Sequence, residues 1–516
     1  MSIEKRTTAR SEPAQAVRRA VEGKEGKEQV DDVQNRPVVD DAQGSPVVDD
    51  AQYRPVRDGG GGGGGGGAIA DYFKFDERGT NLATEVRAGL TTFFVMAYII
   101  FVNASILGAG FKLDPAGIAA VSAGTALIAG IMTIAMGAVA NYPLALAAGL
   151  GINGIVAFSL TARGLSPAGA MGVIVLEGIL VTLLVLVGFR EAVMNAVPLA
   201  LKRAIGVGIG LFILFIGFVN GGFIATPPGG VPVVGPVFPT TMSQFVFLLG
   251  LLLTMILWVM KLRGALIISI LVITVVSLVL GVASVPANFA ATPSFTTLFQ
   301  FDVGNIWSVL GPGVAALTIF AVMLTDFFDT MGTVTGVAAE AGLANEDGSV
   351  PDVGKVLLVD SVAAVVGGVA GISSNTTYIE SAAGVAEGGR TGFTSIVTGV
   401  LFLLAIFLAP LAGIVPAVAT APALVLVGYL MFTQVGGIDV SNVEDGIPSL
   451  LTMILMPLTY DITVGIGAGF ISWVLIKLAR GKVGEIHPLM WVVAIAFLIF
   501  FLQAYIPSLY TAAPAA

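Results

Sequence analysis

The sequence contains no cysteine and only one histidine, His487, among its 516 residues. Disulfides, thiol nucleophiles and Cys-ligated metals are therefore excluded, and a relay or metal site built on histidine is not expected. Charged residues are scarce as well, at 11% of the chain, against about 25% in soluble proteins. No nucleotide-binding Walker motif is present, which argues against drive by ATP. We expect no cofactor, no bound metal and no nucleic-acid partner.

Apolar residues make up 56% of the chain, and the mean hydropathy is +0.92. Many apolar runs reach the roughly 20 residues that a helix needs to cross a bilayer. The sequence therefore predicts an all-α polytopic membrane protein with fourteen transmembrane segments. The predicted segments are 84–107, 116–139, a broken one at 143–160, 169–189, 198–223, 242–260, 264–285, 312–333, 353–371, a broken one at 373–388, 391–411, 415–437, 448–460 and 462–479. A further apolar run, 488–508, is either a fifteenth span or a segment along the membrane.

The composition divides the chain into four parts. Residues 1–70 carry a nine-residue repeat, Val-Asp-Asp-x-Gln-x-x-Pro-Val, and nine consecutive glycines at 59–67. Such a polar, low-complexity tail is expected to be disordered. Residues 71–285 are predicted to form a first seven-span repeat and 286–482 a second, inverted one. Residues 483–516 add a C-terminal hydrophobic segment and tail.

Basic residues predict the orientation, because loops on the cytoplasmic side are enriched in Lys and Arg. A cytoplasmic N-terminus places most of the basic loop residues inside, although Lys112 and Arg163 fall outside. The residues that fit are Arg190, Lys202, Arg203, Lys261, Arg263, Arg390, Lys477, Arg480 and Lys482. The expected location is the plasma (inner) membrane, with multiple passes.

The two halves resemble each other. Each has an interrupted third segment, Ala147–Gly154 in the first half and Gly371–Gly384 in the second. Because seven spans is an odd number, the second copy must be inverted. Irregular polar backbone at membrane depth occurs only where it is buried in protein or lines a cavity. Paired interruptions at matching positions therefore predict a transporter's site near the midplane.

Acidic residues inside apolar segments are candidates for function. They are Glu177, Asp326, Asp329, Asp360, Glu380 and Asp461. Asp326 and Asp329 share one helix face at i, i+3, and the sequence has no Lys or Arg between Arg263 and Lys355. A buried carboxyl without a cation tends to hold a proton, which suits proton coupling; the alternative is that one Asp caps or braces a neighbouring helix. Glu177, Asp360 and Asp461 are expected to be structural or supporting.

Glu380 follows the extended, polar stretch Ser373–Tyr378, where a half-helix is expected to begin. A carboxylate there can accept two N–H donors from a heterocycle such as a purine or a pyrimidine. The alternative is a Glu that only caps the half-helix. Asn153 holds the mirror position in the first half, and its amide offers both a donor and an acceptor. A structural role for Asn153 stays open.

Three stretches resemble the AzgA-like purine permeases, a branch of the nucleobase–cation symporter-2 (nucleobase/ascorbate) family. They are Thr84–Asn103, Asp326–Thr333 and Thr376–Thr391, which are similar to the motifs of the first, eighth and tenth spans. The resemblance covers about residues 72–508 and implies fourteen spans in two inverted repeats. Spans 1–4 and 8–11 would form a core domain that moves, elevator-like, against a gate domain of spans 5–7 and 12–14.

The resemblance also implies a purine base (hypoxanthine, guanine or adenine) imported with a proton. Glu380 would bind the base, and Asp326 and Asp329 would serve the substrate or the proton. Asn153 and the backbone near Tyr378 would face the base. The chain departs from the family where Asn153 is followed by Gly-Ile-Val rather than by aromatic residues, which leaves the preferred purine open.

Other classes of protein fit these residues less well. An anion carrier on the same fold would want a basic or acid-free site, and a channel would want a continuous polar stripe. An enzyme is not expected, because no convincing nucleophile constellation is present. A carrier of another nucleobase stays open. The expected partners are a purine base, protons and the lipid bilayer, and a homodimer is an open assembly.

Overall fold

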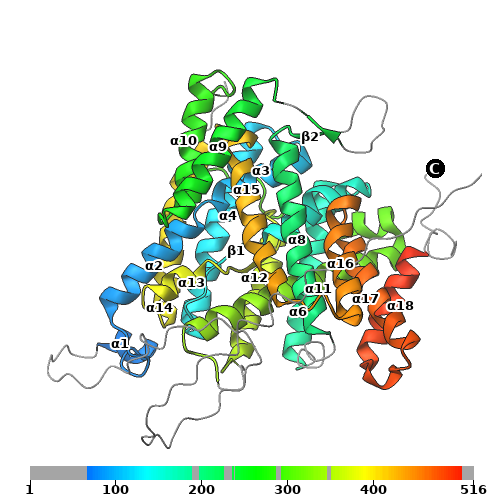
Figure 1. Ribbon diagram of the computed structural model, residues 1–516. Coiled ribbons are helices and arrows are strands. Elements are labelled where there is room, and N and C mark those ends of the chain that lie inside the picture. Colours follow the sequence, from blue (N-terminus) through cyan, green and yellow to red (C-terminus); the bar gives the residue numbers. More distant parts are fainter. Residues whose placement is uncertain are drawn as a thin grey trace, which may run out of the picture. The chain divides into compact units, whose positions relative to one another are not determined.

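The computed structural model describes residues 67–188, 197–225, 235–237, 239–285, 292–345 and 350–502. Nearly all of the predicted tail, the basic residue Arg190 and the last part of the C-terminal segment lie outside the described residues. The described part of the chain is mostly helical (Figure 1).

The helices follow one another with few strands between them. The α-helices are α1 (Ala68–Phe73), α2 (Leu82–Met96), α3 (Ile99–Phe111), α4 (Pro115–Ala135), α5 (Leu150–Gly154), α6 (Pro167–Leu186), α8 (Leu199–Asn220), α9 (Met242–Val259), α10 (Ala265–Val279), α11 (Val303–Glu340), α12 (Val353–Val369), α13 (Ser381–Ala386), α14 (Gly392–Ala405), α15 (Ala417–Phe432), α16 (Val443–Thr459), α17 (Ile462–Ala479) and α18 (Pro488–Phe501). Short 3-10 or π turns are η2 (Met136–Ala140), η3 (Ile155–Leu160), η4 (Ile406–Gly413), η5 (Thr433–Gly437) and η6 (Val483–Glu485). The strands are β1 (Leu146–Ala148), β2 (Ile224–Ala225), β3 (Gly235–Pro236) and β4 (Asn375–Thr377).

Nine helical stretches among the described residues are long and apolar enough to cross a membrane. Local sequence signals set where such helices begin. Asp114 and Ser166 cap α4 and α6 by accepting hydrogen bonds from backbone N–H groups, and a proline follows each cap. Thr241 and Gln244 form a capping box at α9. The prediction of a polytopic helical membrane protein is confirmed.

The two interrupted segments cross each other at the centre of the fold. β1 pairs antiparallel with β4, with Leu146 opposite Thr377 and Ala148 opposite Asn375. A short helix follows each strand, α5 in the first segment and α13 in the second. The pairing satisfies backbone groups that lipid could not satisfy. Both segments are therefore broken where the sequence predicts, and each supplies the other's missing hydrogen bonds.

Glycines allow the helices around this crossing to pack closely. A Cβ on Gly178 of α6 would lie 2.7 Å from the backbone nitrogen of Val365 in α12. A Cβ on Gly172 would lie 2.6 Å from the carbonyl oxygen of Asp302, the residue that caps α11. Small residues at such contacts bring helix backbones together in membranes. As a result α6 is held tightly against both α11 and α12.

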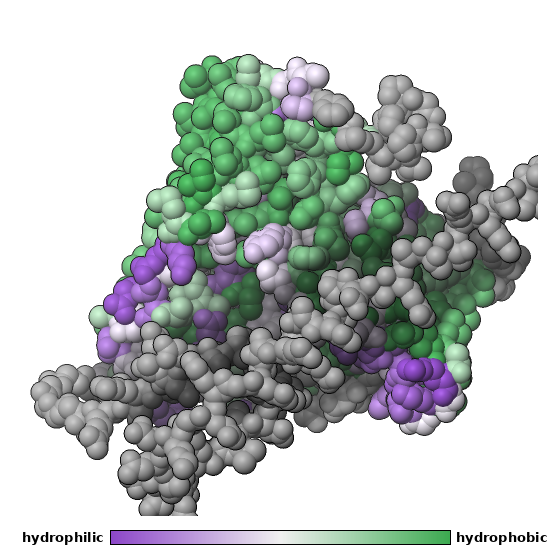
Figure 2. Space-filling model, viewed as in Figure 1, coloured by the Kyte–Doolittle hydropathy of each residue, from purple (hydrophilic) through white to green (hydrophobic). Residues whose placement is uncertain are grey.

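The surface is apolar over the two helices α9 and α10, as Figure 2 shows. Their large exposed side chains include Leu252, Ile256 and Val259 of α9, and Leu271 and Val275 of α10. Exposed apolar area of this extent is typical of a surface that meets lipid or another protein. These helices thus have the surface expected of membrane-spanning segments.

The described part of the C-terminal hydrophobic segment is α18, which packs on α17. The rings of Phe470 and Phe497 lie 6.0 Å apart, and a Cβ on Gly467 would lie 2.8 Å from the Phe501 ring. With 14 residues, α18 is about 21 Å long. That length is shorter than the roughly 30 Å of a bilayer's hydrocarbon core.

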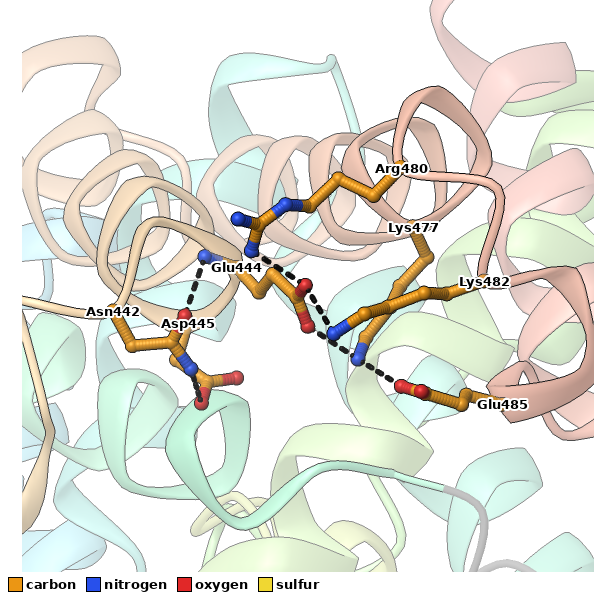
Figure 3. Close-up of polar contacts among 7 residues, drawn as sticks. All are labelled: Asn442, Glu444, Asp445, Lys477, Arg480, Lys482 and Glu485. Atoms are coloured by element: carbon orange, nitrogen blue, oxygen red, sulfur yellow. Dashed lines mark hydrogen bonds and ion pairs between the residues drawn. The ribbon is translucent and has the colours of Figure 1, made fainter.

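A buried ion cluster ties the start of α16 to the end of α17 (Figure 3). The Glu444 carboxylate lies 2.5 Å from Lys477 Nζ, and 2.6 Å from both Arg480 Nη1 and Lys482 Nζ. Lys477 also contacts Glu485 at 2.6 Å. The hydrogen bonds from Lys477 and then Lys482 outweigh desolvation and lower the pKa of Glu444 to about 2. We call these five residues the Glu444 cluster.

Candidate functional site

A cavity of about 480 Å³ lies beside the crossing of the two broken segments. Its walls come from the turn between β1 and α5, from α8, from α11, from the turn between β4 and α13, and from α15. Apolar side chains such as Leu150, Ile209 and Val427 form much of the lining. Most small-molecule sites have this size and combine an apolar wall with a few polar groups.

Glu380 brings a carboxyl group to the cavity. It precedes α13 directly, and its Oε1 accepts a hydrogen bond of 2.6 Å from the Tyr98 hydroxyl. Tyr98 is fully buried, so it holds the carboxyl group in place from α3's side. Asp329 of α11 lines the same cavity. Two half-buried carboxyl groups from distant parts of the sequence therefore face one space.

Tyr378 also lines the cavity and fastens the two broken segments to each other. Its hydroxyl donates a hydrogen bond to the Ala148 carbonyl, and its backbone N–H donates one of 2.9 Å to Ala145. The N–H of Gly149 in turn donates to the carbonyl of Ser374 at 2.8 Å. These bonds fix the backbone of one wall before any ligand arrives, as a pre-formed site requires.

The wall glycines are needed for the close approach of α8. A Cβ on Gly151 would lie only 2.7 Å from Cγ2 of Ile209. A Cβ on Gly149 would lie 2.9 Å from Cγ2 of Thr376. A larger residue at either position would push α8 or β4 away and change the width of the cavity.

Asn153 and Asp326 lie outside the lining of the cavity. Asn153 is fully buried in α5, and neither of its amide atoms has a hydrogen-bond partner. Asp326 is 2% exposed, one helical turn before Asp329, and its Oδ1 has no partner. The structure thus brings Glu380, Tyr378 and Asp329 together at the cavity, and it places the other two predicted site residues behind its walls. Their roles stay predictions.

The remaining acids have different surroundings. Asp360 of α12 accepts hydrogen bonds from the Thr330 hydroxyl at 2.7 Å and from the Thr377 N–H at 2.9 Å. Asp461 caps α17 and forms an ion pair with Arg163. Glu177 of α6 is fully buried, and neither of its carboxyl oxygens has a hydrogen-bond partner.

An aromatic cluster lies on α8 one turn beyond the residues that line the cavity. The lining residues of α8 run from Leu199 to Ile209, and Phe212 follows one turn later. The Phe212 ring lies 5.2 Å from the Tyr460 ring, which also meets the Phe158 ring at 5.6 Å. The opposite end of this stretch of α8 carries Lys202 and Arg203, which line the cavity.

Sequence reasoning missed two polar residues of this region. Tyr98, the partner of Glu380, lies within the first-span motif, where a tyrosine in an otherwise apolar run is the available signal. Glu85 is fully buried at the start of α2. Its carboxylate accepts hydrogen bonds from the N–H of Arg390 at 2.9 Å and the hydroxyl of Thr394 at 2.6 Å. It therefore fastens α2 to the segment after α13.

Within the described ranges, no group of three His, Asp or Glu side chains is placed to hold a metal ion. The Glu380 and Asp329 carboxyl groups of the cavity offer hydrogen-bond acceptors. Two acceptors in an apolar space suit a flat, neutral ligand that carries N–H donors.

Comparison with known proteins places this arrangement in a family. Residues 83–468 match the model of the Permease family, Xan_ur_permease. The guanine/hypoxanthine permease PbuG of Bacillus subtilis is 40% identical over 445 residues, which are 84% of this chain and 99% of that protein. The adenine permease AdeP of Escherichia coli is 39% identical over 83% of this chain and 94% of its own length.

Solved structures share the fold. The transmembrane domain of the cyanobacterial bicarbonate transporter BicA has a TM-score of 0.54 and 17% identity, and the match covers 74% of this chain and 97% of that domain. SLC26A9 has a TM-score of 0.55 and 12% identity, over 80% of this chain and 67% of that protein. At such identities the likeness concerns the fold alone. The matches to the sequence relatives cover nearly the whole length of those proteins, so the resemblance that the motifs indicate is confirmed. The chain belongs to the Permease family and is an integral multi-pass membrane transporter, not an enzyme.

Proposed function

We propose that this protein imports purine nucleobases, with hypoxanthine, guanine or adenine as the substrate. The carrying observation is the cavity in which Glu380 and Asp329 face a largely apolar space of about 480 Å³. Carboxyl oxygens accept the N–H donors of a purine, and apolar walls suit its ring faces. The names of the relatives, guanine/hypoxanthine permease and adenine permease, support the same substrate class.

The base would occupy the cavity between Glu380 and the backbone near Tyr378. Tyr98 would hold the Glu380 carboxyl group in the orientation that accepts two N–H donors. Asp329 would supply a second carboxyl group for the substrate or the proton. Asn153 and Asp326 would act from behind the walls, because neither side chain lines the cavity.

We further propose fourteen spans in two inverted repeats, with a core domain of spans 1–4 and 8–11 that moves against a gate domain of spans 5–7 and 12–14. The antiparallel pairing of β1 with β4 supports this plan, because two inverted segments that meet at their breaks pair in that direction. A homodimer fits the same plan and stays part of the proposal.

We propose that the N-terminus is cytoplasmic, as the distribution of basic loop residues indicates, and that the membrane is the plasma (inner) membrane. On that basis Lys202 and Arg203 would lie at the cytoplasmic end of the cavity, and the aromatic cluster around Tyr460 would lie toward its outer end.

Proton symport is the proposed drive. Carboxyl groups that face a cavity without an ion-pair partner can change protonation as the substrate binds and leaves. In the described part of the chain, neither Asp329 nor Glu380 lies within ion-pair distance of a basic side chain. Accumulation should therefore depend on the proton gradient.

The test is uptake of labelled adenine, guanine, hypoxanthine and uracil in a bacterium that lacks its own nucleobase carriers, each competed with the others. We expect saturable uptake of at least one purine, weak competition by uracil, and loss of accumulation with a protonophore. Accumulation that follows sodium and ignores the protonophore would contradict proton coupling. No uptake of any purine by membrane-inserted protein would contradict the substrate class.

An anion carrier is the rival on this fold, and Lys202 and Arg203 at the cavity mouth are the observation in its favour. Asp329 and Glu380 line the same cavity and would repel an anion. Bicarbonate added to the purine uptake assay distinguishes the two proposals, because it should not compete.

A further inference from the structure

Glu177 is a buried acidic side chain that the proposed cavity site does not use. It lies in the middle of α6, it is fully buried, and neither carboxyl oxygen has a hydrogen-bond partner. A buried ionised carboxylate without partners would be very costly, so the group must carry a proton or meet one during function.

Its neighbours are acids and hydroxyls. Asp360 of α12 and Asp326 of α11 both lie close enough to interact electrostatically with Glu177. The Ser374 side chain lies beside both Glu177 and Asp326, is fully buried, and has no hydrogen bond of good geometry. Glu177 of α6, Asp326 of α11 and Ser374 of the segment before β4 thus lie at one buried spot. Each of these side chains keeps at least one oxygen without a hydrogen-bond partner.

Asp360 differs from the other two acids of this spot. The Thr330 hydroxyl and the N–H of Thr377 donate hydrogen bonds to its carboxyl group. Among the described residues, no Lys, Arg or His lies within ion-pair distance of Glu177 or Asp326. No basic side chain therefore offsets a negative charge on Glu177 or Asp326, which favours a proton at this spot.

We propose that Glu177 and Asp326 together form the binding site for the transported proton, with the Ser374 hydroxyl between them, behind the strand that carries the purine. The inference rests on the proposed function, and it assigns the proton to carboxyl groups other than the cavity carboxyls Asp329 and Glu380, of which Asp329 interacts electrostatically with Asp326. Glu177 is the new member of this proton site. It belongs to α6, a helix that does not line the cavity.

β4 connects the two sites physically. Thr377 and Tyr378 line the cavity at one end of the segment, and Ser374 meets the acid pair at the other. Between them Thr376 lies 2.6 Å from the Thr330 hydroxyl, which itself donates to Asp360. Loss of the proton would leave Ser374 facing two carboxylates and would draw its hydroxyl toward them. Proton occupancy therefore sets the position of the strand that binds the base.

The test compares Glu177→Gln with wild type after purification of the full chain and reconstitution into liposomes. Gln keeps the size of the side chain and cannot release a proton. We expect the variant to exchange internal for external purine while its accumulation under an imposed gradient of about one pH unit falls by about tenfold, because coupling to one proton across such a gradient sustains about a tenfold purine ratio. Glu340→Gln, an exposed acid at the end of α11, is the matched control and should accumulate purine like wild type.

Several outcomes would overturn the inference. Normal gradient-driven accumulation by Glu177→Gln would show that Glu177 is a permanently protonated structural group. Accumulation by the wild type that follows a sodium gradient at constant pH would show that sodium, and not the proton, drives transport, and it would contradict a proton site at Glu177 and Asp326. If wild-type protein transports no purine at all, the proposed function fails first, and that result is distinct from a defect confined to the variant.

A second variant keeps the inference testable if Glu177→Gln does not fold. Ser374→Ala removes the hydroxyl between the two carboxyls without changing charge. We expect it to shift the pH at which purine-driven proton uptake is half-maximal, with purine affinity at saturating proton concentration unchanged. An unshifted pH profile, in protein that binds purine normally, would overturn the role of this spot.

Discussion

Two glutamates of this protein are buried to a similar extent in opposite surroundings. Glu444 is 5% exposed and Glu177 is fully buried. Three basic side chains surround the Glu444 carboxylate (Figure 3), whereas Glu177 meets none and lies near two other acids. The same side chain is thus saturated with partners in one region and left without them in the other.

The difference teaches what each region can do. A carboxylate bound to three cations is held in one protonation state and in one geometry, so the Glu444 cluster acts as a strut between α16 and α17. A buried carboxyl group without partners is costly to ionise, so it favours a proton, and its protonation responds to the charges that come near it. The charged Glu444 cluster at a helix end is therefore expected to keep its protonation state, whereas the acids at the centre of the fold are expected to change theirs.

The largest effect is expected at the adjustable centre, in the cavity itself. Glu380→Gln should abolish purine uptake, because it replaces one acceptor oxygen by an NH2 donor that faces the N–H donors of the base, and because an amide cannot change charge. The measurement is initial uptake of labelled purine at equal amounts of membrane-inserted protein. Near-normal uptake would refute Glu380 as the binding residue. Glu340→Gln is the matched exposed control and should transport normally.

A smaller loss is expected when only the support of Glu380 is removed. Tyr98→Phe deletes the hydroxyl that bonds Glu380 at 2.6 Å and keeps the packing of the ring. A hydrogen bond to a charged group contributes enough to weaken purine binding by about tenfold. Tyr142→Phe, which loses a bond of 2.7 Å to the carbonyl of Pro351 away from the cavity, is the control. Equal KM changes in the two variants would argue against a role for Tyr98 at the site.

Much of the centre was predictable because its composition is unusual for membrane depth. The polar stretch before Glu380 and the matching stretch before Asn153 pointed to two broken segments, and both are broken. Their pairing through β1 and β4 was not predictable, because register between segments more than 200 residues apart depends on the whole fold. Neither was the partnership of Tyr98 with Glu380, for the same reason.

Helical spacing alone also could not separate the two aspartates of α11. Asp326 and Asp329 lie one turn apart on one face, yet only Asp329 lines the cavity. Which of the two aspartates reaches the cavity depends on how α11 packs against β4, and that packing depends on the whole fold. The Glu444 cluster escaped prediction because its cations lie at and just after the end of α17 while Glu444 lies in the first turn of α16, and no local pattern joins them.

Breaking the strut should affect stability rather than transport. Glu444→Gln leaves three cations near one another without their counter-charge, and removal of one partner from a buried pair is strongly destabilising. We expect the thermal unfolding temperature in detergent to fall by several degrees, with the ratio of protons to purine unchanged. Glu485→Gln, at the 55% exposed edge of the cluster, should have a much smaller effect. A lost proton gradient dependence in Glu444→Gln would contradict the division into two regions.

The smallest effect is expected when the stabilisation by the Glu444 cluster is measured at different pH values. The folded pKa of Glu444 is lowered to about 2 from 4.5, first by the hydrogen bond from Lys477. For an acid with a depressed pKa, the stabilisation is fully present above the unfolded value and is lost only as pH falls toward the folded value. The difference in unfolding temperature between wild type and Glu444→Gln should therefore stay constant from about pH 8 to about pH 5 and shrink only below that range. Purine accumulation should change over the same interval, because the proposed symport consumes the proton gradient. A temperature difference that varied together with accumulation would mean that Glu444 takes part in proton binding, and the contrast with Glu177 would fail.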